Sequence, residues 1–212
     1  MAHRDAFNAL IDTMKVTVAA LREADIRFML GGSMAAWARG GPEPDKDLDL
    51  MVDPKQVEAA LETLAATGMR VERPPEEWLY KAWHDEVLID LIFSPSGLEL
   101  TDEVFARADA ISVMAVTMPV MALEDALVTM LYALDEHTLD YSRLLLIARA
   151  LREQIDWPVL RRRASGSPYA KAFLTLVEEL EIAPRVSRGA AAPRDPATGG
   201  THSRVRVVGS TE

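Results

Sequence analysis

The chain has no cysteine among its 212 residues. This absence excludes disulfide bonds, zinc ribbons and thiol nucleophiles, and it is consistent with the reducing cytoplasm, where we expect the protein to act. No apolar run reaches the roughly 18–20 residues that a bilayer span requires, so we expect no membrane partner. The first fifteen residues carry scattered charges and no apolar segment, unlike a secretory signal.

Composition indicates a folded chain of one domain, or of one domain with a helical extension. Apolar residues make up 49% of the sequence, which is enough for a sizeable core. The formal net charge is −10, and an acidic surface repels phosphate backbones, so a sequence-independent nucleic-acid coat is disfavoured. The same charge suits a site that concentrates divalent cations.

Hydrophobic spacing and turn residues predict an α+β fold. We expect a small mixed β-sheet with flanking helices over residues 1–118, a C-terminal helical region over 119–183 and a disordered tail over 184–212. The expected strands are 26–30, 47–52, 69–73, 79–83, 87–93 and 111–117, and the expected helices are 6–24, 34–39, 54–66, 121–134, 139–153, 157–164 and 168–180.

Three carboxylates form the first candidate site. Asp47 and Asp49 are two residues apart in an expected strand, so their side chains leave the same face about 6.6–7 Å apart. Asp90 is an isolated acid in the apolar strand VLIDLIF. If the two strands are neighbours, the three acids converge. Two such charges about 5 Å apart repel by roughly 3 kcal/mol at an effective dielectric constant near 20, so the cluster requires a cation.

The donor set indicates which cation. It consists of oxygen atoms without histidine or cysteine, which suits Mg²⁺ or Mn²⁺, and Mg²⁺ usually completes its coordination with water and substrate phosphates. This is the chemistry of phosphoryl or nucleotidyl transfer. In-line displacement at an α-phosphate commonly uses two metal ions, one for the acceptor hydroxyl and one for the pyrophosphate.

A glycine turn precedes the acids. Gly31, Gly32 and Ser33 follow the expected strand 26–30, and glycines at such a turn allow the backbone to approach phosphate oxygens. We expect Ser33 to cap the helix that follows and to offer a hydroxyl donor. The turn therefore completes a candidate site for a nucleoside triphosphate (NTP).

This combination resembles the DNA polymerase beta-like nucleotidyltransferase superfamily in its minimal bacterial form. The matching segments are Leu30–Val52, with LGGSMAAWARGGPEPDKDLDLMV, and Val87–Phe93. The segment Leu123–Leu151 is similar to the region after the core in the AbiE-type toxin nucleotidyltransferases. The resemblance spans roughly residues 26–155.

The resemblance assigns roles to residues of this chain. It implies that Asp47, Asp49 and Asp90 bind the metal ions, and that the turn Gly31–Ser33 binds the nucleotide phosphates. It also implies that Asp140 matches a nucleotide-binding acid of the helical region. Some enzymes of the toxin branch add nucleotides to tRNA acceptor ends and are paired with an antitoxin, whereas other members of the superfamily modify antibiotics or proteins.

The chain departs from the toxin branch at two places. That branch often has Arg-x-Thr-x-Asp before the acid pair, where this chain has Glu43, Asp45 and Asp47. It also has a phosphate-contacting lysine in the helix after the core, where this chain has Met130. These departures motivate an alternative in which the protein is a degenerate binding module that acts through a partner protein.

Several of the candidate residues also have purely structural interpretations. Asp47 and Asp49 also fit a solvated edge strand, and Asp90 also fits a structural ion pair with Lys81. Lys81 itself is either an exposed strand lysine or a cation for the triphosphate. Asp140 also fits the N-terminal turn of a helix, where an acid favours the macrodipole. The run Arg161–Arg163 is either a solvated helix face or an RNA-backbone contact.

We therefore predict a Mg²⁺-dependent nucleotidyltransferase that moves a nucleoside monophosphate from an NTP to an acceptor hydroxyl. The candidate acceptors are tRNA, with an antitoxin as protein partner, and a small molecule of the antibiotic type. A tRNA acceptor predicts a basic groove beside Asp90, whereas a small-molecule acceptor predicts an acidic, closed pocket.

Overall fold

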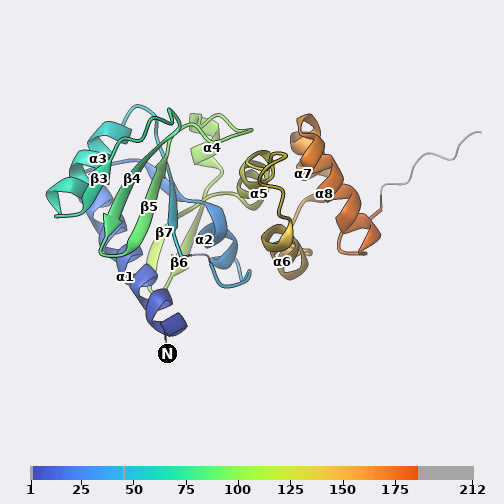
Figure 1. The fold of residues 1–212 in the computed structure, drawn as a ribbon, viewed down its shortest axis with the longest axis horizontal. Helices are drawn as coiled ribbons and strands as arrows, with labels where there is room; N and C mark the ends of the chain where they lie inside the picture. The colour runs from blue at the N-terminus through green and yellow to red at the C-terminus, as the bar shows by residue number, and fades with distance from the viewer. Residues whose placement is uncertain (1, 45, 186–212) are drawn as a thin grey trace, which may run out of the picture.

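A computed structural model of the chain describes residues 2–44 and 46–185. From residue 186 on, the predicted disordered tail lies outside the described residues. Seven strands form one sheet in the order β3-β4-β5-β2-β1-β7-β6 (Figure 1), which confirms the mixed α+β fold. The strands are β1 (Phe28–Leu30), β2 (Leu48–Val52), β3 (Arg70–Glu72), β4 (Leu79–His84), β5 (Val87–Ile92), β6 (Asp109–Val113) and β7 (Val116–Val120).

The centre of the sheet consists of short apolar strands. β2 pairs with β5 in parallel and with β1 in the antiparallel sense, while β1 and β7 are parallel. All three residues of β1 are buried, and the chain leaves this strand directly into the glycine turn. The parallel β2–β5 pair gives both strands the same direction, so equivalent residues of the two strands lie side by side.

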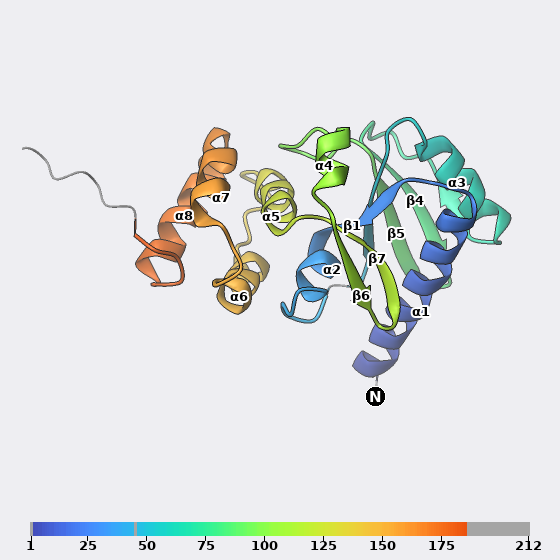
Figure 2. The ribbon, with the colours of Figure 1, turned by 180° about the vertical axis from the view of Figure 1, so that it is seen from behind.

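Helices cover the sheet and extend beyond one side of it (Figures 1 and 2). α1 packs on α3, which in turn contacts β3, β4 and β5, whereas α2 packs against β2 and α5. The spacing of apolar residues predicts a buried stripe of Ala6, Leu10, Met14, Val18 and Leu21 in α1. The last four of these side chains are buried, whereas Ala6 is exposed. The helices of this part are α1 (Ala2–Glu23), α2 (Gly32–Trp37), α3 (Val57–Ala66) and α4 (Asp102–Ala106).

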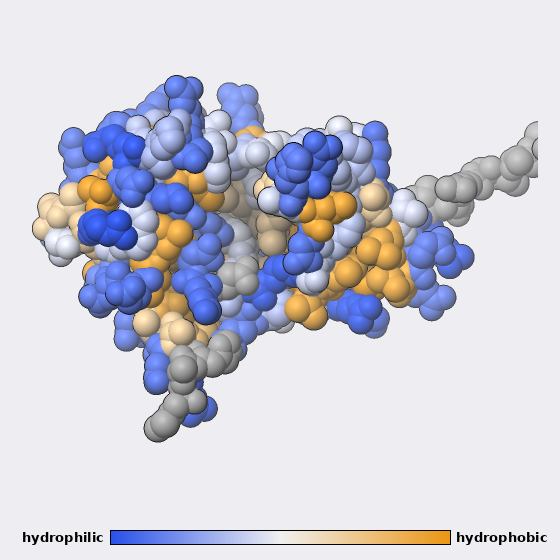
Figure 3. Space-filling model, viewed as in Figure 1, coloured by the Kyte–Doolittle hydropathy of each residue, from blue (hydrophilic) through white to orange (hydrophobic). Residues whose placement is uncertain are grey.

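A second apolar cluster holds the C-terminal helices together. It gathers side chains from α5, α6, α7 and α8 around the fully buried Phe173, and it includes Ala36 of α2. The elements are α5 (Leu123–Tyr132), α6 (Ser142–Leu151), α7 (Trp157–Arg163), the 3₁₀ turn η1 (Ala164–Gly166) and α8 (Pro168–Glu179). Figure 3 shows a recess between this helical region and the sheet, with hydrophobic and hydrophilic residues interspersed. Within the described residues, no helix has the length and apolarity needed to cross a membrane.

The sheet ends in a hairpin where one strand over 111–117 was predicted. β6 and β7 are antiparallel, and Met114 and Ala115 connect them with φ angles of 47° and 67°. Such a two-residue turn normally contains asparagine or glycine, because both central residues need positive φ. The pair Met-Ala carries no such signal, so the prediction of a single strand was wrong.

A buried ion cluster joins the two parts of the chain. Asp125 of α5 is 0% exposed and forms ion pairs with Arg107, which follows α4, and with Arg163 at the end of α7. The Arg107 Nη2 to Asp125 Oδ2 distance is 2.9 Å. A buried carboxylate is stable only when it is paired and hydrogen-bonded, and the two arginines provide this compensation for Asp125.

This cluster yields a stability prediction. The substitution Asp125→Asn removes the negative charge of the ion cluster and leaves the two partly exposed arginines, Arg107 and Arg163, without their shared partner. We expect the free energy of unfolding to fall by about 1–3 kcal/mol, the range for hydrogen bonds to charged groups. Urea denaturation followed by circular dichroism measures this change. Glu153→Gln, at the exposed Arg152–Glu153 pair, is the matched control and should change nothing measurable. Equal losses in both variants would contradict a structural role of the cluster.

Candidate active site

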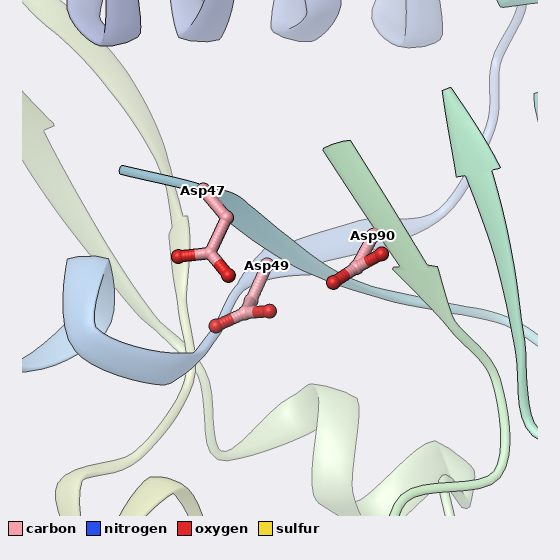
Figure 4. A group of neighbouring side chains, drawn as sticks. All are labelled: Asp47, Asp49 and Asp90. Atoms are coloured by element: carbon pink, nitrogen blue, oxygen red, sulfur yellow. The ribbon is translucent and has the colours of Figure 1, made fainter. Parts of the chain in front are cut away.

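The three predicted carboxylates lie together on one face of the sheet (Figure 4). Asp47 immediately precedes β2, Asp49 lies within it, and the parallel register places Asp49 directly opposite Asp90 of β5. One carboxylate oxygen from each residue lies within 4.8 Å of the others. The spatial assumption behind the sequence prediction is therefore confirmed: neighbouring strands bring the three acids together.

Asp90 is the most unusual of the three side chains. Its Oδ1 atom is buried and has no hydrogen-bond partner in the described part of the chain. Burial raises the pKa of Asp90 to about 6, Lys81 opposes this shift, and the charge of Asp47 adds to it. Lys81 of β4 is directly across from Asp90 in the β4–β5 register, so it lies on the same face as the acids.

These acids fit a divalent metal ion. The donor set consists of carboxylate oxygens, which Mg²⁺ and Mn²⁺ prefer. The buried Oδ1 of Asp90 also lacks the partner that a buried polar atom normally has. A cation between the three side chains would satisfy this atom and offset the repulsion among the acids.

The glycine turn approaches the acids very closely. The Gly31 amide donates to the backbone carbonyl of Asp49 over 2.9 Å, and Gly32 has a φ of 51°. A Cβ atom on Gly32 would lie 1.8 Å from Asp49 Oδ2. Only glycine fits here, because any side chain would occupy the position of the carboxylate.

Ser33 lies in this turn but not as the predicted cap. α2 begins at Gly32 with Gly31 as its N-cap residue, and Ser33 is buried inside the first turn. The helix therefore begins two residues earlier than a Ser33 cap would place it, and Gly32 at its first position has a left-handed φ, which glycine adopts readily. The prediction that Ser33 caps the helix was therefore wrong, and its contact with nucleotide phosphates stays a prediction.

Two hollows flank the acids along the strand direction. The larger, about 710 Å³, lies towards the start of β2 and β5, and the smaller, about 350 Å³, lies towards their ends. We call them the entry-end hollow and the exit-end hollow. The entry-end hollow is lined by Ala6, Phe7, Leu10, Glu43, Pro44, Lys46, Asp47, Glu86, Leu88 and Arg143. The exit-end hollow is lined by Gly32, Asp49, Met51, Trp78, Ile92, Pro95, Ser96, Thr129, Met130 and Ala133.

Asp140 and the run Arg161–Arg163, the other candidate residues, do not line the hollows beside the acids. Asp140 is exposed, accepts a hydrogen bond from the Ser142 amide and lines neither hollow. That hydrogen bond lowers the pKa of Asp140, which suits the helix-terminal interpretation. In the run Arg161–Arg163, Arg161 pairs with Glu178 and Arg163 pairs with Asp125.

Sequence reasoning missed most of the residues that line the hollows. Leu10 was expected only in the apolar stripe of a helix and Leu88 only within an apolar strand, and Phe7 was not singled out. Trp78 and Ser96 were not singled out as site residues either. No sequence signal joins these residues, because they belong to segments that meet only in the folded chain.

The fold and this site define a nucleotidyltransferase. A model of a family described as uncharacterised nucleotidyltransferases matches residues 19–187, and the chain belongs to that family. A comparison with curated proteins gives no match.

Solved structures of similar fold include other nucleotide-transferring enzymes. The crystal structure of ANT(2″)-Ia in complex with adenylyl-2″-tobramycin has 16% identity and a TM-score of 0.57, and the match covers 77% of this chain and 98% of that one. The solution structure of the same antibiotic-resistance factor has 17% identity and a TM-score of 0.53, covering 79% and 92%. The lincomycin-bound lincosamide adenylyltransferase LnuA has 13% identity and a TM-score of 0.44, covering 66% and 92%.

The close approach of Gly32 generates one prediction. Gly32→Ala places a methyl group where Asp49 Oδ2 lies, so the carboxylate must move and Mn²⁺ binding should weaken at least about tenfold. Electron paramagnetic resonance of free Mn²⁺ measures the affinity. Gly40→Ala is the matched control, because Gly40 also has positive φ, 91°, but open space around it. Unchanged Mn²⁺ binding in Gly32→Ala would contradict the assigned geometry.

The raised pKa of Asp90 generates a second prediction, on the pH dependence of stability. Because the folded metal-free protein binds this proton more tightly than the unfolded chain, Asp90 lowers the free energy of unfolding as pH rises from about 4 to about 6. After allowance for solvent screening, Asp90→Asn should stabilise the metal-free protein by about 1–2 kcal/mol at pH 7. The gain should shrink towards pH 4, where the native side chain is also neutral.

Chemical denaturation at both pH values, with a chelator present, measures this difference. If Asp90→Asn is stabilised equally at pH 4 and pH 7, or is destabilised at pH 7, burial of the carboxylate charge is not the cause of the raised pKa.

Proposed function

We propose that the protein catalyses Mg²⁺-dependent transfer of a nucleoside monophosphate from an NTP to the hydroxyl of a small molecule. The observation that carries this proposal is the convergence of three carboxylate oxygens within 4.8 Å, directly beside the glycine turn. In the reaction, the acceptor oxygen bonds to the α-phosphorus, the bond from that phosphorus to the β-phosphate oxygen breaks, and pyrophosphate leaves.

Each residue of the site has a role in this reaction. Asp47, Asp49 and Asp90 would hold the divalent ions, which neutralise the triphosphate and activate the hydroxyl when bound. Asp90 also receives the hydroxyl proton. The backbone of Gly31–Ser33 holds the phosphates, and Lys81 adds a positive charge on the same face.

A small-molecule acceptor suits the surroundings of the acids better than tRNA does. The entry-end hollow next to Asp47 has both carboxylates and cations on its wall, and no basic groove is formed by the residues that line it. Two arginines of the run Arg161–Arg163 are engaged in ion pairs, which removes the main candidate for an RNA contact. ANT(2″)-Ia, which has a similar fold, is described in complex with an adenylylated antibiotic. The tRNA acceptor, the antitoxin partner and the AbiE-type branch rest on the sequence resemblance alone.

One departure from the toxin branch lines the exit-end hollow, whereas Asp45 of the other departure lies outside the described residues. Met130, where that branch has lysine, lines the exit-end hollow together with Gly32 and Asp49. Lys81 is then the cation that we assign to the triphosphate, and we place the reaction in the cytoplasm, where NTPs are present. Isothermal titration with Mg²⁺ and each NTP separates this enzyme from a binding module, because a module that has lost the site binds no NTP at millimolar concentration.

The metal carboxylates give the direct test. Asp47→Asn should lower transfer from an α-³²P-labelled NTP to acceptors in a cell extract by at least about 100-fold, because groups that only support metal ligands already contribute about 10- to 100-fold. Circular dichroism should show an unchanged fold. Asp12→Asn, on the exposed side of α1, is the control and should retain full activity. Full transfer by Asp47→Asn would refute the proposed site.

A further inference from the structure

The two hollows lie on opposite sides of the acids along β2 and β5, and the alternation of side chains along the strands shows which residues belong to each side. Side chains two residues apart on a strand share a face, so Leu88 and Ile92 lie on either side of Asp90 along β5. In the same way, Asp47 precedes Asp49 and Met51 follows it along β2. The entry-end hollow contains Asp47 and Leu88, and the exit-end hollow contains Asp49, Met51 and Ile92. The acids therefore lie between two separate cavities, one towards each end of β2 and β5, and the first turns of α1 reach the entry-end hollow from the opposite face of the sheet.

In-line transfer requires two such spaces. The attacking oxygen and the leaving pyrophosphate must lie on opposite sides of the α-phosphorus. Gly32 lines the exit-end hollow, so the phosphates held by the glycine turn belong on that side. The acceptor then belongs to the entry-end hollow. This assignment rests on the proposed function, because it uses the transfer geometry.

The entry-end hollow has an apolar floor. Phe7 and Leu10 are three residues apart on α1 and share a helix face, and Leu88 lies across from them on β5. Phe7 is held by an edge-to-face contact with Trp37 of α2, with ring centroids 5.4 Å apart. α1 is fixed by the 2.9 Å hydrogen bond between Thr13 and His84. Its first turns are thus a positioned wall, and the volume of about 710 Å³ is that of a ligand pocket.

The charges around this floor nearly balance. Apart from Asp47, which belongs to the metal site, the charged residues among the described lining of the hollow are two acids, Glu43 and Glu86, and two cations, Lys46 and Arg143. A polyanion such as an RNA end would meet both acids, and a polycation would meet both basic groups. Recognition of a highly charged ligand requires an excess of the opposite charge, and these residues provide no such excess for a polyanion or for a polycation.

We propose that the entry-end hollow binds the acceptor, and that this acceptor is an alcohol with an apolar face and little net charge. Its apolar part packs on Phe7, Leu10 and Leu88, while its hydroxyl faces Asp90. That oxygen attacks the α-phosphorus, its proton passes to the Asp90 carboxylate, and pyrophosphate leaves into the exit-end hollow.

The absence of native cysteine permits a direct test by cysteine footprinting. Ala6→Cys places a thiol in the entry-end hollow, and Ser96→Cys places one in the exit-end hollow, both at exposed positions. Maleimide labelling rates are measured with and without Mg²⁺ and ATP, GTP, CTP or UTP. An exposed thiol on β6, in Ala110→Cys, is the control for general effects.

The expected result is that one Mg²⁺–NTP slows labelling of Ser96→Cys at least about fivefold and leaves Ala6→Cys unchanged. Protection of Ala6→Cys by the NTP would overturn the assignment of the hollows while leaving nucleotide transfer intact. Protection of neither thiol by any NTP would overturn the proposed function itself, so the two failures are distinguishable.

The chemistry of the acceptor is tested with probes of different charge. n-Octyl-β-D-glucoside below its micelle concentration is a neutral alcohol with an apolar face, tobramycin is a polycation, and tRNA is a polyanion. We expect the glucoside alone to slow labelling of Ala6→Cys, at least about threefold, with Ala110→Cys unaffected. In the double variant Ala6→Cys/Leu88→Gln this protection should disappear, while Ser96→Cys/Leu88→Gln keeps its NTP protection. Protection by tobramycin or tRNA, or none by the glucoside, would overturn the proposal.

Discussion

The parallel pairing of β2 with β5 is the constraint on which the site depends. It sets Asp49 beside Asp90 and brings Asp47 to the same face, with an oxygen from each within 4.8 Å. At that separation each pair of charges repels by about 3 kcal/mol at an effective dielectric constant near 20. The register persists because it is also the one that buries Leu48, Leu50, Ile89 and Leu91, since a shift by one residue would turn these side chains to the other face.

The site is therefore a place where folding and catalysis have opposite requirements. Burial of Asp90 is unfavourable for its charged form and raises its pKa, yet that charged form is the one a metal ion needs. Gly32 adds a second such conflict, because its left-handed backbone and missing side chain are required for the approach to Asp49. Both residues break local rules of stability at the candidate site, and such exceptions are typical of functional sites.

The sequence indicated the acids and the fold because each leaves a local signature. An isolated aspartate in an apolar strand, as in VLIDLIF, interrupts the apolar pattern, and alternation identified the face that Asp47 and Asp49 share. The β6–β7 hairpin was missed because Met114 and Ala115 adopt positive φ without the usual residue types. The hollows were missed for another reason. Phe7, Leu88 and Met130 come from distant segments, and side chains that line a cavity have the same periodicity as side chains that fill a core.

The first turns of α1 have a consequence for how enzymes of this kind diversify. The family match begins at residue 19, so the acids and the glycine turn lie within it, whereas Ala6, Phe7 and Leu10 lie before it. The proposed acceptor hollow thus combines side chains from before the matched segment with others, such as Leu88 and Arg143, from inside it. Under the proposed assignment, exchanges on the first turns of α1 would reshape part of the acceptor wall and leave the reaction centre untouched, because those turns contribute no group to the bond-making step.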